Sequence, residues 1–320
     1  MKKNILAIHT GGTISMSSNN GVVSEQQKNP VTVENNLDLP VNVTEVYPIT
    51  KPSPHITVKD MDSIKEIIQK HESEYDGFVI THGTDTLEET AYFLELSVNT
   101  KRPIVLTGAM RSFDELGSDG LYNYLLAIRV AENEASLDRG VLVVFNDEIH
   151  TARFVTKTHT SNVATFQSPN HGPIGFVTKD DVYYHHSIQT KEKFEHVDTD
   201  KKIALIKAHV DLDSLFFEAV VENNFDGLIV EALGQGNIPP SALDGLRKVI
   251  EADIPAVVVS RSFNGIVGGY YDYKGGGREL KNLGAIFSNG LNGQKARIKL
   301  LIALSNQLEY EELAESFRQN

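Results

Sequence analysis

The 320-residue sequence contains no cysteine, which excludes disulfide bonds, thiolate metal sites and a cysteine nucleophile. No apolar run approaches the roughly 20 residues that a membrane-spanning helix needs, so we expect no membrane association. Positive charge is in deficit, because 30 lysines and arginines stand against 43 aspartates and glutamates. The net charge of −13 argues against a nucleic-acid partner, since phosphate binding requires clustered basic side chains.

Motifs of metal and cofactor binding are also missing. The sequence has no HExxH zinc motif, no GxGxxG dinucleotide motif and no GxxxxGK[ST] phosphate loop. His9, His82 and His150 fall near the ends of predicted strands, where hydrogen bonding is favoured over metal ligation for lone histidines. The sequence therefore predicts neither a metal site nor a cofactor.

The composition is that of an ordinary globular protein, with 40% hydrophobic and 23% charged residues. Short apolar runs alternate with helical patterns along most of the chain. Over residues 1–190 this alternation predicts a larger N-terminal α/β domain with a doubly wound, largely parallel sheet. A polar linker is expected at 191–202, followed by a smaller α/β C-terminal domain at 203–320. The first apolar run is too short for a signal peptide and predicts the first strand of a cytoplasmic protein.

The individual elements follow from the same patterns. The expected strands cover residues 5–8, 41–46, 78–81, 104–107, 141–145, 150–154, 203–208, 227–233 and 256–260. The expected helices cover residues 58–74, 86–96, 119–134, 213–223, 240–252, 293–305 and 309–318. The polar stretch at 15–30 is expected to be a loop that acts as a lid.

Two of the predicted strands end in turns rich in glycine and threonine. The first motif, residues 5–15, is ILAIHTGGTIS, and the second motif, residues 77–87, is GFVITHGTDTL. In open α/β sheets, ligands bind at the carboxyl ends of strands where two strands diverge, so the two turns are expected to form one site. Thr13 follows two glycines that permit close backbone approach. Thr84 and Asp85 are expected at the start of a helix, whose free N–H groups suit a carboxylate.

A threonine hydroxyl is a weak nucleophile unless a positioned base activates it. Lys157 beside Thr84 would supply proton transfer, and Asp85 would hold an α-ammonium group. Taken singly, each residue has a simpler interpretation: Thr13 as a turn residue, Thr84 and Asp85 as a helix cap, and Lys157 as a solvated lysine. The presence of both long motifs at strand ends favours the catalytic interpretation.

The two motifs resemble the two signatures of the bacterial-type L-asparaginases, and Val155–Thr158 resembles that family's lysine segment. The resemblance implies an amidohydrolase that converts L-asparagine to L-aspartate and ammonia through an acyl-enzyme, without a cofactor. It implies Thr13 as the nucleophile and Thr84, Asp85 and Lys157 as a second catalytic cluster, although which threonine attacks first stays open. It also implies a cytoplasmic homodimer or homotetramer.

The same resemblance extends to substrate binding. Ser53 matches a family serine that binds the substrate carboxylate, and Pro54 stands where relatives that also cleave glutamine commonly have a glutamine. We therefore expect low glutaminase activity. Asp272 is the best positional match to an acidic residue that relatives supply from a neighbouring subunit. Residues 14–46 contain no tyrosine, whereas many relatives carry one in the loop after the first signature.

Two alternatives remain open. One is the glutaminase-like subunit of a tRNA-dependent amidotransferase, which usually carries an extra N-terminal domain, whereas the TGGT turn of the first motif starts here by residue 10. The other is a non-catalytic amino-acid sensor on the same scaffold. The retention of Thr13, Thr84, Asp85 and Lys157 argues against a sensor. Ammonia release from asparagine separates an enzyme from a sensor.

Overall fold

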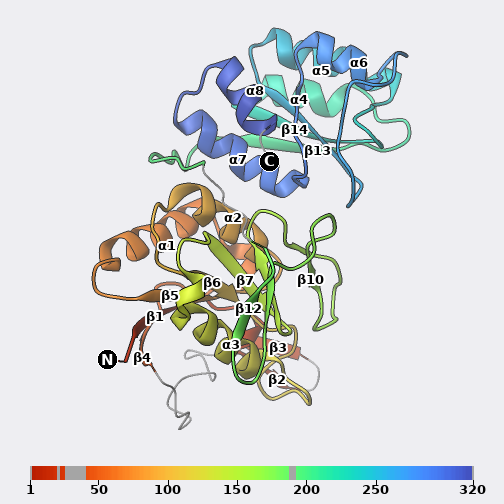
Figure 1. Ribbon diagram of the computed structural model, residues 1–320. Coiled ribbons are helices and arrows are strands. Elements are labelled where there is room, and N and C mark those ends of the chain that lie inside the picture. The colour runs from red at the N-terminus through yellow and green to blue at the C-terminus, as the bar shows by residue number, and fades with distance from the viewer. Residues whose placement is uncertain (1, 20–21, 26–40, 187–191, 319–320) are drawn as a thin grey trace. The chain divides into compact units, whose positions relative to one another are not determined.

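The computed structural model describes residues 2–19, 22–25, 41–186 and 192–318, without the side chains of 16–19 and 22–25. The chain divides into two compact units, the first ending at Lys193 and the second beginning at Phe194 (Figure 1). The linker at 191–202 and the domain bounds on either side of it stay predictions. Among the described residues, no helix is both long and apolar enough to cross a membrane.

The first unit is built on an eight-stranded sheet with the order β12-β11-β8-β7-β6-β5-β1-β4. Five strands run parallel to one another: β4 (Asn42–Val46), β1 (Asn4–His9), β5 (Gly77–Thr81), β6 (Ile104–Thr107) and β7 (Val141–Phe145). Every residue of β5, β6 and β7 is buried, as is typical of parallel sheets covered on both faces. The predicted doubly wound, largely parallel sheet is confirmed.

Strand β1 lies between β4 and β5, with Ile8 opposite both Val46 and Ile80. The chain leaves β1, forms β4 on one side and returns to form β5 on the other side. The connections that follow β1 and β5 therefore diverge at the carboxyl edge of the sheet. This is the switch point at which open α/β sheets bind ligands.

Helices cover both faces of this sheet. Figure 1 shows α1 (Val58–His71) and α2 (Leu87–Ser97) on one side and α3 (Gly120–Glu132) on the other. Every second residue of β1, Ile5 and Ala7, belongs to the core cluster that includes the buried side chains of α3. The strand period of two thus gives one face to α3 and the other to α1 and α2.

The N-terminus of α1 is fixed by a capping box. Thr57 Oγ1 accepts a hydrogen bond from Asp60 N, and Asp60 Oδ2 accepts one from Thr57 N at 2.8 Å. Burial would raise the pKa of Asp60, but hydrogen bonds from Lys51 and Thr57 outweigh it and lower this pKa. The ion pair between Lys51 and Asp60, at 2.8 Å, ties the segment before Ser53 to α1.

A tight turn reverses the chain after β7. Asn146 and Asp147 both have positive φ, 47° and 67°, which is the backbone of a two-residue hairpin turn. The next strand, β8, therefore spans Glu148–Thr151, and the expected range of 150–154 was wrong at both ends. Strands β11 (Gly175–Val177) and β12 (Val182–Tyr184) complete this antiparallel side of the sheet.

The stretch that follows the first motif is partly regular. A short 3-10 turn, Thr13–Ser15, leads into β2 (Met16–Asn19), which pairs antiparallel with β3 (Val22–Glu25). The expectation of a plain loop was wrong here, because polar strands such as MSSN give no apolar alternation. Residues 20–21 and 26–40, on which the lid prediction mainly depends, lie outside the described residues.

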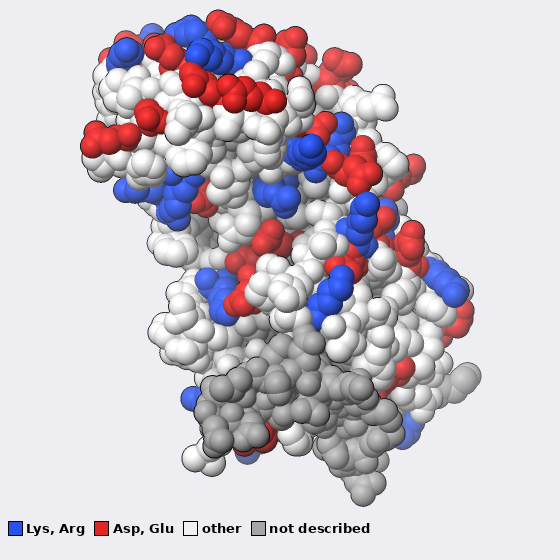
Figure 2. All heavy atoms as spheres, turned by 180° about the vertical axis from the view of Figure 1, so that it is seen from behind, with Lys and Arg blue, Asp and Glu red and all other residues white. Residues whose placement is uncertain are grey.

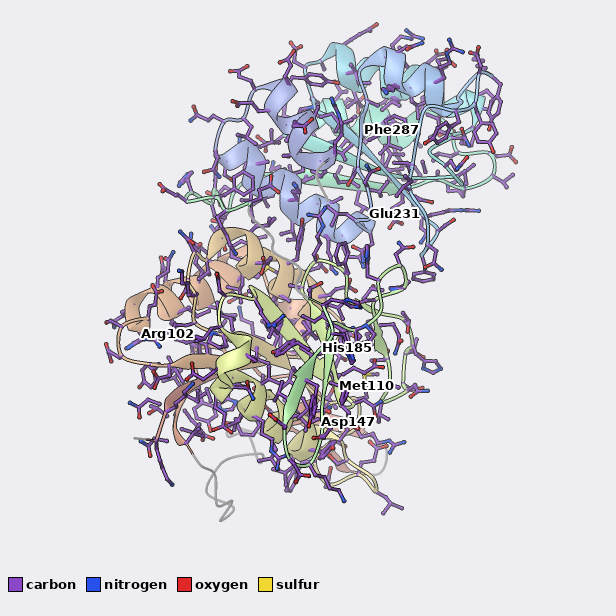
Figure 3. All side chains as sticks on the ribbon, in the orientation of Figure 1. Arg102, Met110, Asp147, His185, Glu231 and Phe287 are labelled. Carbon is purple, nitrogen blue, oxygen red and sulfur yellow. The ribbon has the colours of Figure 1, made fainter. Side chains whose placement is uncertain are left out.

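The second unit contains a four-stranded parallel sheet with the order β13-β14-β15-β16. Its strands are β13 (Ile203–Lys207), β14 (Gly227–Ala232), β15 (Ala256–Ser260) and β16 (Ile286–Phe287). Its helices are α4 (Leu215–Glu222), α5 (Leu243–Glu251), α6 (Gly277–Leu283), α7 (Gly293–Ser305) and α8 (Tyr310–Arg318). The sequence did not predict α6 or β16, which are seven and two residues long. Figure 3 labels Phe287 in β16 and Glu231 near the end of β14.

The surface carries both signs of charge. On the face shown in Figure 2, acidic and basic side chains of the described residues are interspersed, and the basic ones form no extended patch.

Candidate active site

Three segments of the first unit pack backbone against backbone at the carboxyl edge of the sheet. Thr10 N donates to Thr81 O at 3.1 Å, and Lys51 N donates to Thr10 O at 3.3 Å. A Cβ added to Gly83 would lie 2.6 Å from Ser53 Oγ, so only glycine permits this approach. The turns after β1 and β5 and the Ser53 segment are thereby held together.

These segments line one cavity of about 350 Å³. Ser53 and Thr84 in its wall are almost fully buried, with 4% and 6% exposure. Six residues that the sequence singles out line this cavity: Thr13, Ser53, Pro54, Thr84, Asp85 and Lys157. The structure thus brings together all of the candidate residues of the first unit.

Lys157 reaches the second motif from a short strand, β9 (Thr156–Lys157), which pairs with β10 (Phe166–Gln167). Its Nζ donates to Thr84 Oγ1 at 2.9 Å and to Asp85 Oδ1 at 2.6 Å. The Lys157 side chain is only 16% exposed, whereas that of Asp85 is 58% exposed. Thr84 and Lys157 are therefore within the distance that proton transfer requires.

The helix after the second motif begins later than expected. Helix α2 starts at Leu87, so Thr84 and Asp85 lie in the turn before it and do not form its first turn. Thr86 Oγ1 donates to Ser53 O at 2.8 Å, and Asp85 N donates to Ser53 Oγ at 3.2 Å. The sequence predicts free N–H groups for a carboxylate in this region, and the N–H of Asp85 is instead bound to Ser53.

A buried carboxylate that the sequence did not single out lies below Lys157. Glu88, in the first turn of α2, accepts hydrogen bonds from Thr156 Oγ1 at 3.0 Å and from Lys157 N at 3.3 Å. It is 4% exposed. Glu88 therefore connects the strand that carries Lys157 to the helix that follows Thr84. Its only signal in the sequence is that an acidic residue directly follows the second motif.

His82, between β5 and Gly83, is fully buried and neutral. Its Nδ1 lies 2.8 Å from Gly83 O, and its Nε2 lies 2.9 Å from Thr90 Oγ1. These contacts fit the tautomer in which Nδ1–H donates to Gly83 O and Nε2 accepts from Thr90. Burial lowers the pKa of His82 to about 4, although the hydrogen bond to Gly83 acts in the opposite direction. The ring therefore supports the turn of Thr84 without carrying charge at neutral pH.

The other two candidate histidines, His9 and His150, also make hydrogen-bonding contacts. His9 Nδ1 lies 2.8 Å from Thr81 Oγ1, and His150 Nδ1 lies 3.0 Å from Ser168 Oγ. The interpretation of these histidines as hydrogen-bonding groups is confirmed. Within the described parts of the chain, no group of three or more His, Asp or Glu side chains is placed to hold a metal ion.

The loop after β6 forms a further wall of the cavity, with Met110, Ser112 and Glu115 in its lining. Met110 is labelled in Figure 3. Asp119 fixes the loop, since its carboxylate accepts hydrogen bonds from Met110 N at 3.1 Å and Arg111 N at 3.0 Å. No motif in the sequence marks this wall, although the loop follows the carboxyl end of the strand next to β5, where the switch-point rule places ligand contacts.

Asp272 belongs to the second unit and is not among the residues that line the cavity. Its side chain is 77% exposed and pairs with Arg278 at 3.2 Å. A role for Asp272 in the site of a neighbouring subunit stays a prediction.

Family models and known proteins match nearly the whole chain. The model "Asparaginase, N-terminal" matches residues 4–190, and "Glutaminase/Asparaginase C-terminal domain" matches residues 202–317. The chain is 32% identical to the L-asparaginase of Bacillus licheniformis over 97% of this chain and 98% of that one. It is 37% identical to the probable L-asparaginase of Deinococcus radiodurans over 98% and 96%. The crystal structure of the probable cytoplasmic L-asparaginase from Campylobacter jejuni matches with a TM-score of 0.88 at 28% identity, covering 99% of both chains. The chain belongs to the asparaginase family of amidohydrolases.

Proposed function

We propose that the protein hydrolyses L-asparagine to L-aspartate and ammonia, using its own side chains and no cofactor. One observation carries this proposal: Thr13 and Thr84 line the same cavity, and Lys157 Nζ lies 2.9 Å from Thr84 Oγ1. A hydroxyl nucleophile paired with a proton-transfer partner is what acyl transfer from an amide needs. The full-length similarity to L-asparaginases supports the same substrate.

In the proposed reaction, Thr13 Oγ forms a bond to the side-chain amide carbon of asparagine. The C–N bond then breaks, and ammonia leaves with the proton that the threonine hydroxyl loses. Water next cleaves the resulting ester, which releases aspartate and restores the hydroxyl. The pair of Thr84 and Lys157 moves protons to and from the reacting groups, because its two polar atoms are in direct contact inside the cavity.

The substrate's backbone groups are assigned to Ser53 and Asp85. Ser53 Oγ accepts a hydrogen bond from Asp85 N, which leaves its own hydroxyl hydrogen available for the α-carboxylate of the substrate. The half-exposed carboxylate of Asp85 attracts the α-ammonium group. Pro54, in the same wall, adds no polar side-chain atom, which favours asparagine over glutamine.

Assembly and compartment complete the proposal. We place the protein in the cytoplasm, as a homodimer or homotetramer. Three tyrosines of one loop of the second unit, Tyr270, Tyr271 and Tyr273, are 66%, 43% and 53% exposed, and exposed aromatic side chains are common in interfaces. Light scattering of the active protein tests the oligomer, and cell fractionation tests the compartment.

The decisive experiment measures ammonia release from L-asparagine by the purified chain, beside Thr13→Ala as the control. The acyl-enzyme is tested by stopping the wild-type reaction in acid and searching for an aspartyl group on the peptide that contains Thr13. Binding of asparagine without ammonia release would favour the sensor. An aspartyl group on the Thr84 peptide would reverse the roles of the two threonines.

A further inference from the structure

The charges around the cavity are unevenly paired. Three ionisable side chains line it: Asp85, Glu115 and Lys157. Lys157 Nζ lies 2.6 Å from Asp85 Oδ1, so these two charges largely offset one another. Glu115 has no ion pair with any basic side chain among the described residues. The lining therefore keeps an excess of one negative charge, and Glu115 carries it.

Glu115 is held in place by a hydrogen-bonded turn. Its backbone N–H donates to Ser112 O at 3.0 Å, and its carbonyl accepts from Ser118 N at 3.0 Å. Arg111 Nη1 closes the same loop by donating to Gly117 O at 2.8 Å. The carboxylate itself accepts a hydrogen bond from Ser112 N at 3.4 Å, which positions it before the ligand arrives and reduces the entropy that binding costs.

The same turn offers a second polar group to a ligand. Ser112 lines the cavity and is fully buried, and its Oγ makes no hydrogen bond to any described residue. A buried hydroxyl without a partner is unfavourable, and a bound polar ligand would relieve that cost. The wall formed by Ser112 and Glu115 is therefore suited to a cationic, hydrogen-bonding group.

We propose that Glu115 is a specificity-determining residue that binds the α-ammonium group of the substrate together with Asp85. This inference rests on the proposed function, since it concerns one group of the same amino-acid substrate. Because Lys157 offsets much of the charge of Asp85, Asp85 alone attracts a cation weakly. Glu115 restores the negative charge from another segment of the wall, the loop after β6, and an amide that lacks the amino group gains nothing from it.

The test compares two substrates that differ only in this amino group, L-asparagine and succinamic acid. Glu115→Gln keeps the shape of the side chain and removes its charge. We expect kcat/KM to fall about tenfold on asparagine and to stay within about twofold on succinamic acid, as loss of a charged hydrogen bond predicts. Equal losses on both substrates would overturn the proposal.

Asp114→Asn is the matched control, because it removes one negative charge from the neighbouring position, which does not line the cavity. We expect it to leave kcat/KM on asparagine within about twofold, as is usual for a screened surface charge. A tenfold loss in this control as well would show that only the overall charge of the loop matters.

Calorimetry separates this inference from the proposed function. We expect the wild type to bind L-aspartate more tightly than succinate, and Glu115→Gln to lose most of that preference. An inactive wild type with this binding pattern would refute asparagine hydrolysis and keep the role of Glu115. An active wild type whose preference for L-aspartate over succinate survives Glu115→Gln would support asparagine hydrolysis and refute the role of Glu115.

Discussion

Gly12 and Gly83, one from each threonine motif, lie with their backbones in direct contact. A Cβ added to Gly12 would lie 2.3 Å from Gly83 Cα and 2.4 Å from Gly83 N. Gly12 also has a φ of +86°, a backbone conformation that L side chains rarely adopt. This contact brings Thr13 and Thr84 to one cavity, because each threonine follows its glycine directly in the chain.

We expect Gly12→Ala to reduce kcat/KM by about a hundredfold or more, since a displacement near 1 Å at a reacting group has effects of this size. Gly172→Ala is the matched control, because Gly172 also has positive φ, +70°, but its Cβ would meet no atom within 4 Å. The control should lose about 1–2 kcal/mol of unfolding free energy and keep its activity. Equal activity in the two variants would show that the contact between the glycines does not position the threonines.

Thr13→Ala and Thr84→Val should each lower kcat by several powers of ten while the proteins fold normally, because both hydroxyls act within one catalytic unit. Circular dichroism and thermal unfolding check the fold, and ammonia release measures turnover. Thr160→Val is the control, since Thr160 lines the same cavity and has no assigned role. If either catalytic variant kept more than about a tenth of wild-type turnover, its role here would be wrong.

Lys157→Met should abolish turnover and still bind aspartate measurably, because it removes the group that exchanges a proton with Thr84 at 2.9 Å. Lys157→Arg should also be inactive, since a guanidinium does not give up its proton at working pH. The Lys157→Arg variant would nevertheless keep a positive charge beside Asp85. An active Lys157→Arg enzyme would therefore mean that charge alone, and not proton transfer, is required at this position.

The sequence predicted the parallel strands well and the local geometry of the site less well. Strands such as β6 and β7 were predictable because continuous apolar runs of four or five residues are typical of buried strands and too short for helices. The contact of Thr84 with Lys157 spans 73 residues, so no local pattern contains it, and the expectation depended mainly on the family resemblance. Thr86 is the N-cap residue of α2, close to the expected start, but no local pattern records that its hydroxyl donates to Ser53 O.

Glu88 and Glu115 were missed for a different reason. Each is one acidic residue among 43 in the chain, and its meaning depends on which segments the fold brings beside it. Glu88 matters because β9 lies against α2, and Glu115 because the loop after β6 closes over the cavity. Such roles follow from tertiary contacts, which composition and periodicity do not record.

Protein stability should fall as the pH is lowered from about 6.5 to 4, in part because of His82. Burial lowers the pKa of His82 in the folded state to about 4 from its ordinary value of 6.5. Between these values the unfolded chain binds a proton that the folded protein does not, so acid favours unfolding. Two to three pKa units correspond to about 3 kcal/mol of unfolding free energy.

Denaturant unfolding at a series of pH values measures this effect. His82→Gln removes the titrating group, so its unfolding free energy should depend less steeply on pH between 4 and 6.5 than that of the wild type. His55→Gln, at an exposed histidine, is the control and should keep the wild-type slope. The same slope in His82→Gln and the wild type would assign the acid sensitivity to other groups.

Substrate choice should depend on the short turn that contains Pro54. Ser53–His55 form one turn of 3-10 helix, and Thr86 Oγ1 holds it by donating to Ser53 O at 2.8 Å. Glutamine is one methylene longer than asparagine, so its amide reaches the threonines only if its backbone groups bind farther back. A turn that is stiffened by proline and tied to Thr86 resists that shift.

We therefore expect kcat/KM for asparagine to exceed that for glutamine by at least about a hundredfold. This ratio is near the upper limit of the discrimination that an apolar pocket achieves between substrates that differ by one methylene. Pro54→Gln should raise activity on glutamine, because it adds an amide that can bind the displaced backbone groups and loosens the turn. Pro52→Gln is the matched control, since Pro52 lines the same cavity one residue before Ser53. A gain in both variants would point to loosening of the turn alone. Comparable kcat/KM values of the wild type on asparagine and glutamine would refute the preference itself. If Pro54→Gln gains no activity on glutamine, the preference for asparagine belongs to another part of the cavity wall.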